Sequence, residues 1–217
     1  MRLHRLLLIA VLFLTCGVTT TYAQFGYGEP SRTFEITPFG GTRFGGAIDL
    51  NSGPFSQLDI KSSFDYGIMG DVTIFPNVEA EFMWNRQPTQ LTGIDFTTGV
   101  PSPVGNANLD MYQWGVNVAL RNAQAKLVPF VAFGLGFTHY GTDFPTGFSN
   151  GFAYSLGGGV KYFFTQHWGA RLDVRYSPSR TTTSTGTVCD FFGECFNVPV
   201  NNYAHQGQAN LGLIFRF

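Results

Sequence analysis

Apolar residues alternate with small or polar residues along most of this chain, a spacing of two that is typical of β-strands. The alternation predicts eight strands, over residues 32–42, 63–75, 78–88, 109–121, 127–140, 151–164, 167–177 and 203–217. After residue 23, no stretch has the 18 or more apolar residues that a membrane-spanning helix needs. The predicted fold class is therefore all-β.

The two faces of these strands differ in size and polarity. The strand over 167–177 carries Leu172 and Tyr176 on one face, and Arg171 and Asp173 on the other. A closed barrel of eight strands has room inside for modest side chains only, so the bulky face is expected to point outward, into lipid. Closure also pairs every backbone polar group, as a membrane requires. The pattern predicts an eight-stranded antiparallel up-and-down transmembrane β-barrel; a soluble secreted barrel with reversed faces is the alternative.

The connections alternate between short and long. Short joins are predicted at residues 76–77, 122–126 and 165–166, and longer ones at 43–62, 89–108, 141–150 and 178–202. Outer-membrane barrels have short periplasmic turns and long extracellular loops, and this chain follows that arrangement. Pro38 fits badly inside the first strand because it lacks an N–H group, so we expect a bulge there or a later strand start.

The first 23 residues have the features of a secretory signal peptide. Two arginines precede an apolar run that extends to Cys16, and Thr21-Tyr22-Ala23 supplies small residues at cleavage spacing. We expect cleavage before Gln24, so that residues 24–217 form the barrel domain. An uncleaved anchor is the alternative.

Composition favours a membrane barrel over a soluble globule. Charged residues make up 12% of the chain and aromatic residues 16%, and there are 27 glycines. The formal net charge is −1, and it becomes about −3 when the two arginines of the signal peptide are removed. Such a chain has no basic field for nucleic acid, so nucleic-acid binding is excluded.

Charged residues fall on the face that is predicted to line the lumen. Acidic residues dominate the first three strands and basic residues the last three. Because buried charges are costly unless they are paired, we expect ion pairs across a narrow lumen. This network would plug the barrel; a narrow polar pore is the alternative interpretation. The predicted network comprises Glu35, Asp65, Asp71, Glu79, Glu81, Lys161, Arg171, Asp173, Arg175 and Arg216.

The chain ends on ANLGLIFRF, in which Leu213, Phe215 and Phe217 continue the apolar alternation. This ending, with the signal peptide and the eight strands, resembles outer-membrane β-barrels of the OmpA/OmpX type over nearly all of residues 24–217. The resemblance implies a monomeric protein of the bacterial outer membrane, in contact with outer-membrane lipid. It also implies that the barrel-assembly machinery recognises the terminal strand through its final aromatic residue, as a membrane-insertion signal.

No group of residues identifies a catalytic, cofactor or metal site in the sequence. A lipid-active enzyme would need a Ser/His/acid arrangement, and His139 and His205 lack a local His-x-Ser pairing. We therefore expect a non-enzymatic barrel without a cofactor, with a structural or surface-interaction role through its extracellular loops. A small-solute channel and a lipid-modifying enzyme are the alternatives. Because an exported chain enters an oxidising compartment, Cys189 and Cys195 are expected to form a disulfide.

Overall fold

A computed structural model describes residues 33–49, 55–95, 97–120, 125–142, 150–181, 186–189, 195–198 and 203–217. The predicted signal peptide lies outside these residues. Within them, no helix is long and apolar enough to cross a membrane.

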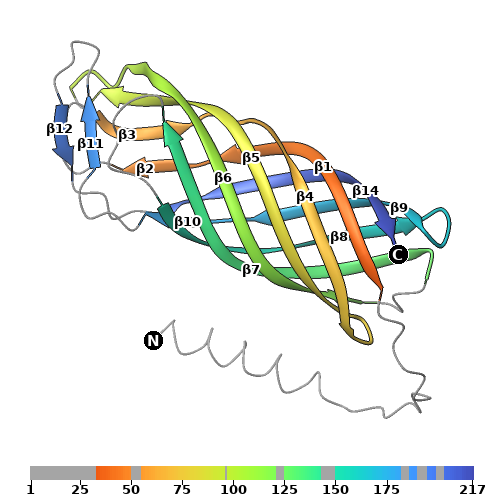
Figure 1. Cartoon of the computed structure of the whole chain (residues 1–217). Coiled ribbons are helices and arrows are strands. Elements are labelled where there is room, and N and C mark those ends of the chain that lie inside the picture. Colours follow the sequence, from red (N-terminus) through yellow and green to blue (C-terminus); the bar gives the residue numbers. More distant parts are fainter. Residues whose placement is uncertain are drawn as a thin grey trace, which may run out of the picture.

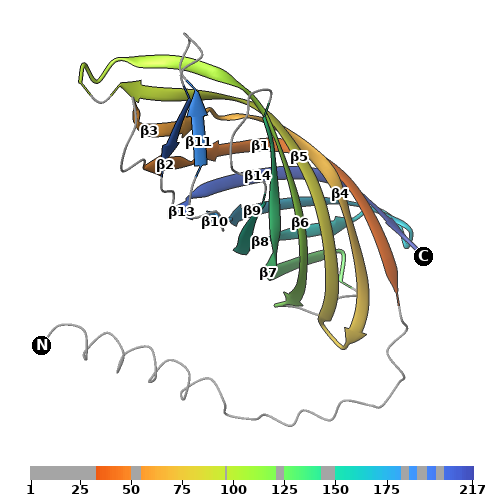
Figure 2. The same ribbon diagram turned by 60° about the vertical axis from the view of Figure 1, so that its left-hand side comes forward.

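Eight long strands form a closed barrel (Figures 1 and 2). Each pairs in antiparallel fashion with its neighbours along the chain, and the last strand closes the sheet by pairing with the first. The predicted fold is therefore confirmed. The barrel strands are β1 (Phe34–Gly45), β4 (Ser63–Phe75), β5 (Val78–Asp95), β6 (Pro101–Ala119), β7 (Leu127–Thr142), β8 (Asn150–Phe163), β9 (Trp168–Tyr176) and β14 (Gln206–Arg216).

The pairing register determines how steeply the strands tilt. From Gly40 in β1, paired residues lead through β4, β5 and β6 to His139 in β7. In the other direction, through β14, β9 and β8, they lead to Pro129, ten residues away. This offset of ten residues around the closed sheet is the shear of the barrel. With strands about 4.8 Å apart and a rise of about 3.3 Å per residue, it gives a strand tilt of about 40° and a barrel radius of about 8 Å. Side chains fill a barrel this narrow.

Short strands extend the wall at one end of the barrel, which we call the loop end. Figure 1 shows β2, β3, β11 and β12 there and the C-terminus at the opposite, short-turn end. β3 pairs with β5, and β11 pairs with β12. The short strands are β2 (Ala47–Asp49), β3 (Phe55–Ile60), β10 (Ser179–Thr181), β11 (Gly186–Cys189), β12 (Cys195–Val198) and β13 (Tyr203–Ala204).

The predicted loop over residues 89–108 is wrong. β5 and β6 continue through most of it as a paired hairpin, up to a turn after Asp95. The added part of β6 contains Pro101 and Pro103, which lack the N–H group that a ladder needs. In the described part of the chain, however, β6 pairs with β7 only from Ala107 onward, so these prolines lie at a sheet edge, where a missing N–H group is tolerated.

Pro38 lies inside β1 without the expected bulge or later strand start. The register between β1 and β4 passes through Pro38, opposite Ile68, without a shift. Pairing with β14 omits Thr37 and Pro38 but keeps the same register on both sides of them. The missing N–H group therefore interrupts one ladder only, and the neighbouring pairs keep the strand in line.

Side chains divide between the lumen and the outer face as predicted. Leu172 on the outer face is 51% exposed, whereas Arg171 and Asp173 on the inner face are each 1% exposed. The last residue also helps to close the barrel, because the Phe217 backbone N–H donates to the Phe34 carbonyl at 2.9 Å. The bulky face thus lies outside, and the charged face is sealed within.

Candidate functional site in the barrel lumen

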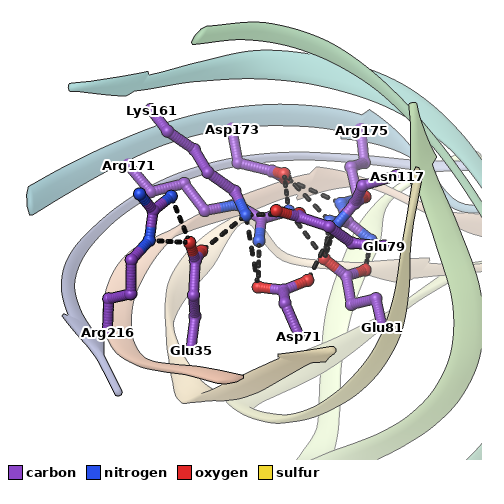
Figure 3. Close-up of polar contacts among 10 residues, drawn as sticks. All are labelled: Glu35, Asp71, Glu79, Glu81, Asn117, Lys161, Arg171, Asp173, Arg175 and Arg216. Atoms are coloured by element: carbon purple, nitrogen blue, oxygen red, sulfur yellow. Dashed lines mark hydrogen bonds and ion pairs between the residues drawn. The ribbon is translucent and has the colours of Figure 1, made fainter. Parts of the chain in front are cut away.

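Strand alternation turns every second side chain of the barrel into the lumen. The ten charged residues predicted for the lumen all lie on this inner face. Nine are at most 8% exposed, and the side chain of Arg216, at the short-turn end, is 16% exposed. Most of the carboxylates come from β1, β4 and β5, and the cations from β8, β9 and β14. Closure of the barrel brings the two sets together (Figure 3).

Lys161 lies among three carboxylates. Its Nζ atom is 2.7 Å from Glu35, 2.5 Å from Glu79 and 3.7 Å from Asp71. Oxygens of these three acids lie within 4.8 Å of one another, a spacing at which a metal ion could bind. The ammonium group of Lys161 lies between them and supplies the positive charge that such a cluster needs.

Two arginines form the densest part of the lumen. Arg175 donates to both Glu81 oxygens, at 2.6 and 2.8 Å, and its Nε atom donates to Asp173 at 2.8 Å. Arg171 bridges Asp71 and Glu81, at 3.0 and 2.6 Å. Forked guanidinium–carboxylate contacts of this kind are directional as well as strong, so they fix the side chains in place.

Asn117 joins this part of the lumen, although it carries no charge. Its amide donates to Asp71 at 2.7 Å and to Glu81 at 3.0 Å. Sequence reasoning missed Asn117 because it searched for charges only. Its inward parity in β6 was the signal that could have identified it. We call the nine charges in contact the ion-pair network: Glu35, Asp71, Glu79, Glu81, Lys161, Arg171, Asp173, Arg175 and Arg216.

The tenth predicted residue, Asp65, belongs to a different group. It accepts a hydrogen bond from Asn85 at 3.2 Å, and no salt bridge of Asp65 occurs within the described residues. The guanidinium of Arg43 is fully buried nearby and donates to Gln208 at 2.9 Å. Arg43 was missed because the first strand was predicted to end at residue 42, although Arg43 has the same inward parity as Glu35.

We call this second set the loop-side group. In every strand that contributes to it, this group lies closer to the loop end than the ion-pair network or Asn117 does. Several buried polar atoms of the group have no partner within the described residues. These atoms include Nε and Nη1 of Arg43 and both amide atoms of Gln113 and Asn210. The group comprises Arg43, Asp65, Asn85, Gln113, Ser155, Gln208 and Asn210.

Apolar clusters lie near both ends of the lumen, beside the polar residues. At the short-turn end, Phe163 packs with Val128 and Ile214, and the Arg216 guanidinium lies 3.5 Å from the Phe163 ring centre. At the loop end a larger cluster includes residues of β3, the strand that extends the wall beside β5. It comprises Leu58, Ile60, Leu91, Ala107, Leu109, Tyr140 and Ala204. A third cluster, formed by Phe39, Met69, Met83, Met111 and Ala153, lies in the middle of the lumen, so apolar and polar side chains alternate along it.

The histidines considered for catalysis are not brought into a triad by the described residues. His139 lies on the outer face, where its Nδ1 atom is 3.0 Å from Asn150 Oδ1. His205 Nδ1 lies 2.5 Å from the Tyr176 hydroxyl. Ser155 is fully buried on the lumen side, so the wall of the barrel separates it from His139.

Two further predictions concern the loop end and the terminal strand. In the β11–β12 hairpin, Cys189 is the direct Cα partner of Cys195. The disulfide itself stays a prediction. Leu213 in β14 and Phe217, just after its end, are exposed, and the ring centres of Phe215 and Trp168 are 4.3 Å apart. The role of this ending as an insertion signal also stays a prediction.

The sequence profile of the outer membrane protein beta-barrel domain matches residues 11–217. The chain belongs to this family. It is also similar to solved structures, at identities that show the fold alone. Neisserial surface protein A is 12% identical, with a TM-score of 0.54 and coverage of 85% of this chain and 97% of that one. AlkL is 16% identical, with a TM-score of 0.56 and coverage of 86% and 90%.

A major outer membrane protein from Thermus thermophilus is 11% identical, with a TM-score of 0.50 and coverage of 85% of this chain and 99% of that one. No curated protein sequence matches the chain. Membership of the outer membrane barrel family and these neighbours indicate the bacterial outer membrane, as the resemblance implied. The short-turn end accordingly faces the periplasm and the loop end the exterior.

Proposed function

We propose that this protein is a non-enzymatic outer-membrane barrel with a plugged lumen, and that it acts through the surface at its loop end. The observation that carries the proposal is the set of contacts across the lumen. Carboxylates from β1, β4 and β5 meet Lys161, Arg171 and Arg175 from β8 and β9 at 2.5 to 3.0 Å. Passage of an ion would require these pairs to separate.

Separation of the pairs is unfavourable for a physical reason. A buried charge that loses its partner costs about 3–5 kcal/mol. Lys161, Arg171 and Arg175 each have two or more carboxylate partners. Arg216 has one carboxylate partner, Glu35, and lies over the Phe163 ring. Three buried apolar clusters also fill the lumen beside and between the polar groups. These features favour a plug over the alternative, a small-solute channel.

The loop end supports a surface role. There the wall is extended by β3, which pairs with β5, and by the long β5–β6 hairpin. The β11–β12 hairpin adds a further projection, and a disulfide between Cys189 and Cys195 would hold its strands together. Among the described residues, Nδ1 of His139 contacts Asn150 and Nδ1 of His205 contacts the Tyr176 hydroxyl, neither of which is the serine that a Ser/His/acid arrangement would need.

Conductance across a planar lipid bilayer tests the plug. The purified wild-type protein should give no stable unitary current steps in molar KCl. Replacing Glu81 and Arg175 together by serine should produce discrete steps, because it removes the densest contacts of the network. Arg86→Ser is a matched control, since Arg86 lies on the outer face and its loss should leave the lumen closed. Stable wild-type steps that change with Arg171→Glu would contradict the proposal and support a channel.

A further inference from the structure

The ion-pair network contains more acids than cations. Within the described residues, five carboxyl groups of the network meet four cations, which are Lys161, Arg171, Arg175 and Arg216. Arg43 and Asp65, the other buried charges of the described lumen, have opposite signs and do not alter this difference. The lumen would therefore carry one excess negative charge if every acid were ionised.

The excess lies around Lys161. In the densest part of the network, Arg171 and Arg175 balance two acids, and each arginine contacts both of them. Around Lys161 and Arg216, by contrast, two cations meet three acids, whose oxygens lie within 4.8 Å of one another. We call these three the acid triad: Glu35, Asp71 and Glu79.

No further cation balances the acid triad from the neighbouring strands that the structure describes. Arg171 contacts Asp71 at 3.0 Å but is shared with the two acids of the densest part. β7 contributes the neutral ring of Phe130, 4.5 Å from the Arg171 guanidinium carbon. The groups that face the triad from the other strands are Glu81 of β5, Asn117 of β6, Lys161 of β8, Arg171, Asp173 and Arg175 of β9, and Arg216 of β14 (Figure 3).

We propose that the acid triad holds one proton at neutral pH, which balances the charge of the network and makes the plug sensitive to pH. The three acids are at most 8% exposed, and a buried charge without a partner is strongly unfavourable. Acids that share one site also oppose each other's ionisation. The inference rests on the sealed lumen of the proposed function, because a conducting lumen could supply a cation from solution instead.

Loss of this proton changes the charge of the plug. One carboxyl O–H bond breaks, the proton passes to water, and one excess negative charge stays in the network. Glu79 is the acid with the fewest cation contacts, since Lys161, which it shares with Glu35, is its one cation among the described residues. The contacts of Lys161 are therefore the part of the plug that alkaline pH should weaken first.

Infrared spectroscopy of the full mature chain in a detergent without ester groups tests the proposal. A protonated carboxyl group has a C=O stretch that a carboxylate lacks. At neutral pH the wild type should show this band at the intensity of one carboxyl group per chain. Glu79→Gln and Asp71→Asn should each abolish it, because four acids then balance four cations. Asp59→Asn, in β3 and outside the network, should leave the band unchanged.

Urea titration at several pH values provides a second measurement. Above about pH 5 the unfolded chain has lost its carboxyl protons, so a native barrel that keeps one is destabilised as pH rises. The equilibrium constant for unfolding should rise about tenfold more per pH unit in the wild type than in Glu79→Gln. The histidines are common to both chains and cancel in this comparison.

Either of two results would overturn the proposal: a wild type without the carboxyl band at neutral pH, or equal pH slopes in the wild type and Glu79→Gln. A band that survives in both Glu79→Gln and Asp71→Asn would do so as well, since the proton would then lie elsewhere. The proposed function is tested separately by conductance. A wild type that neither conducts nor shows the band would overturn the bound proton alone.

Discussion

The two polar regions of the lumen differ in charge and in how many of their polar atoms have hydrogen-bond partners. In the ion-pair network, Glu81 accepts hydrogen bonds from Arg171, Arg175 and Asn117. In the loop-side group, both amide atoms of Gln113 and two nitrogens of Arg43 have no partner among the described residues. Buried polar groups without protein partners are usually satisfied by water. The comparison teaches that charged contacts across the lumen are concentrated in the network, whereas the loop-side group makes fewer of them and contacts methionines, as Arg43 contacts Met111 and Gln208 contacts Met83.

The largest effect should come from removing a shared carboxylate of the network. Glu81→Gln takes a charge from both Arg171 and Arg175 and should lower the free energy of unfolding by about 3–5 kcal/mol. Urea titration of the refolded protein, followed by tryptophan fluorescence, measures it.

Glu79→Gln is the matched control in the same strand and on the same face. Glu79 contacts Lys161, which keeps Glu35 as a partner, so its loss should cost clearly less than that of Glu81. Equal losses from the two variants would mean that the network is not organised around the arginines.

An intermediate effect distinguishes the two regions with one pair of variants in β6. Asn117→Ala removes an amide that donates to the carboxylates of Asp71 and Glu81, and should cost about 1.5–3 kcal/mol, the range for hydrogen bonds to charged groups. Gln113→Ala, four residues away on the same face, removes an amide without a partner among the described residues and should cost less than about 1 kcal/mol. The same urea titration measures both.

Both changes delete an amide side chain from the same inner wall, so the difference between them isolates the bonds to the network. If Gln113→Ala proved as costly as Asn117→Ala, the two hydrogen bonds from Asn117 to the carboxylates would not be what distinguishes the two regions.

The sequence was sufficient to predict the barrel and most of the charged lumen, for a physical reason. A strand places every second residue inward, so the parity of Glu81 or Arg171 fixes its face whatever its exact partners are. Acidic residues dominate the first strands and basic residues the last ones, so the two sets must face each other across the lumen when the barrel closes. The hairpin over residues 89–108 escaped prediction because the alternation was judged to end at residue 88 and to resume at residue 109, whereas the pairing of β5 with β6 continues between them.

The partners within the lumen could not be predicted from parity alone. Shear shifts each strand along its neighbours, and this shift decides that Lys161 meets Glu35 and Glu79, while Asp65 meets Asn85. Neutral residues such as Asn117 gave no charge signal. Arg43 was not predicted to lie in the lumen because the end of the first strand was placed a few residues too early, and strand boundaries are the least certain part of such a prediction.

The smallest effect is expected when the charges of the loop-side group are removed together. Arg43→Met combined with Asp65→Asn should change the free energy of unfolding by no more than about 1 kcal/mol, because buried charges of both signs can be replaced by residues of similar volume at little or no cost. Urea titration checks this against Glu81→Gln, which removes one sign only and leaves two buried arginines short of a partner. A loss from the double variant as large as that from Glu81→Gln would break the comparison, since the loop-side group would then stabilise the barrel as much as the network does.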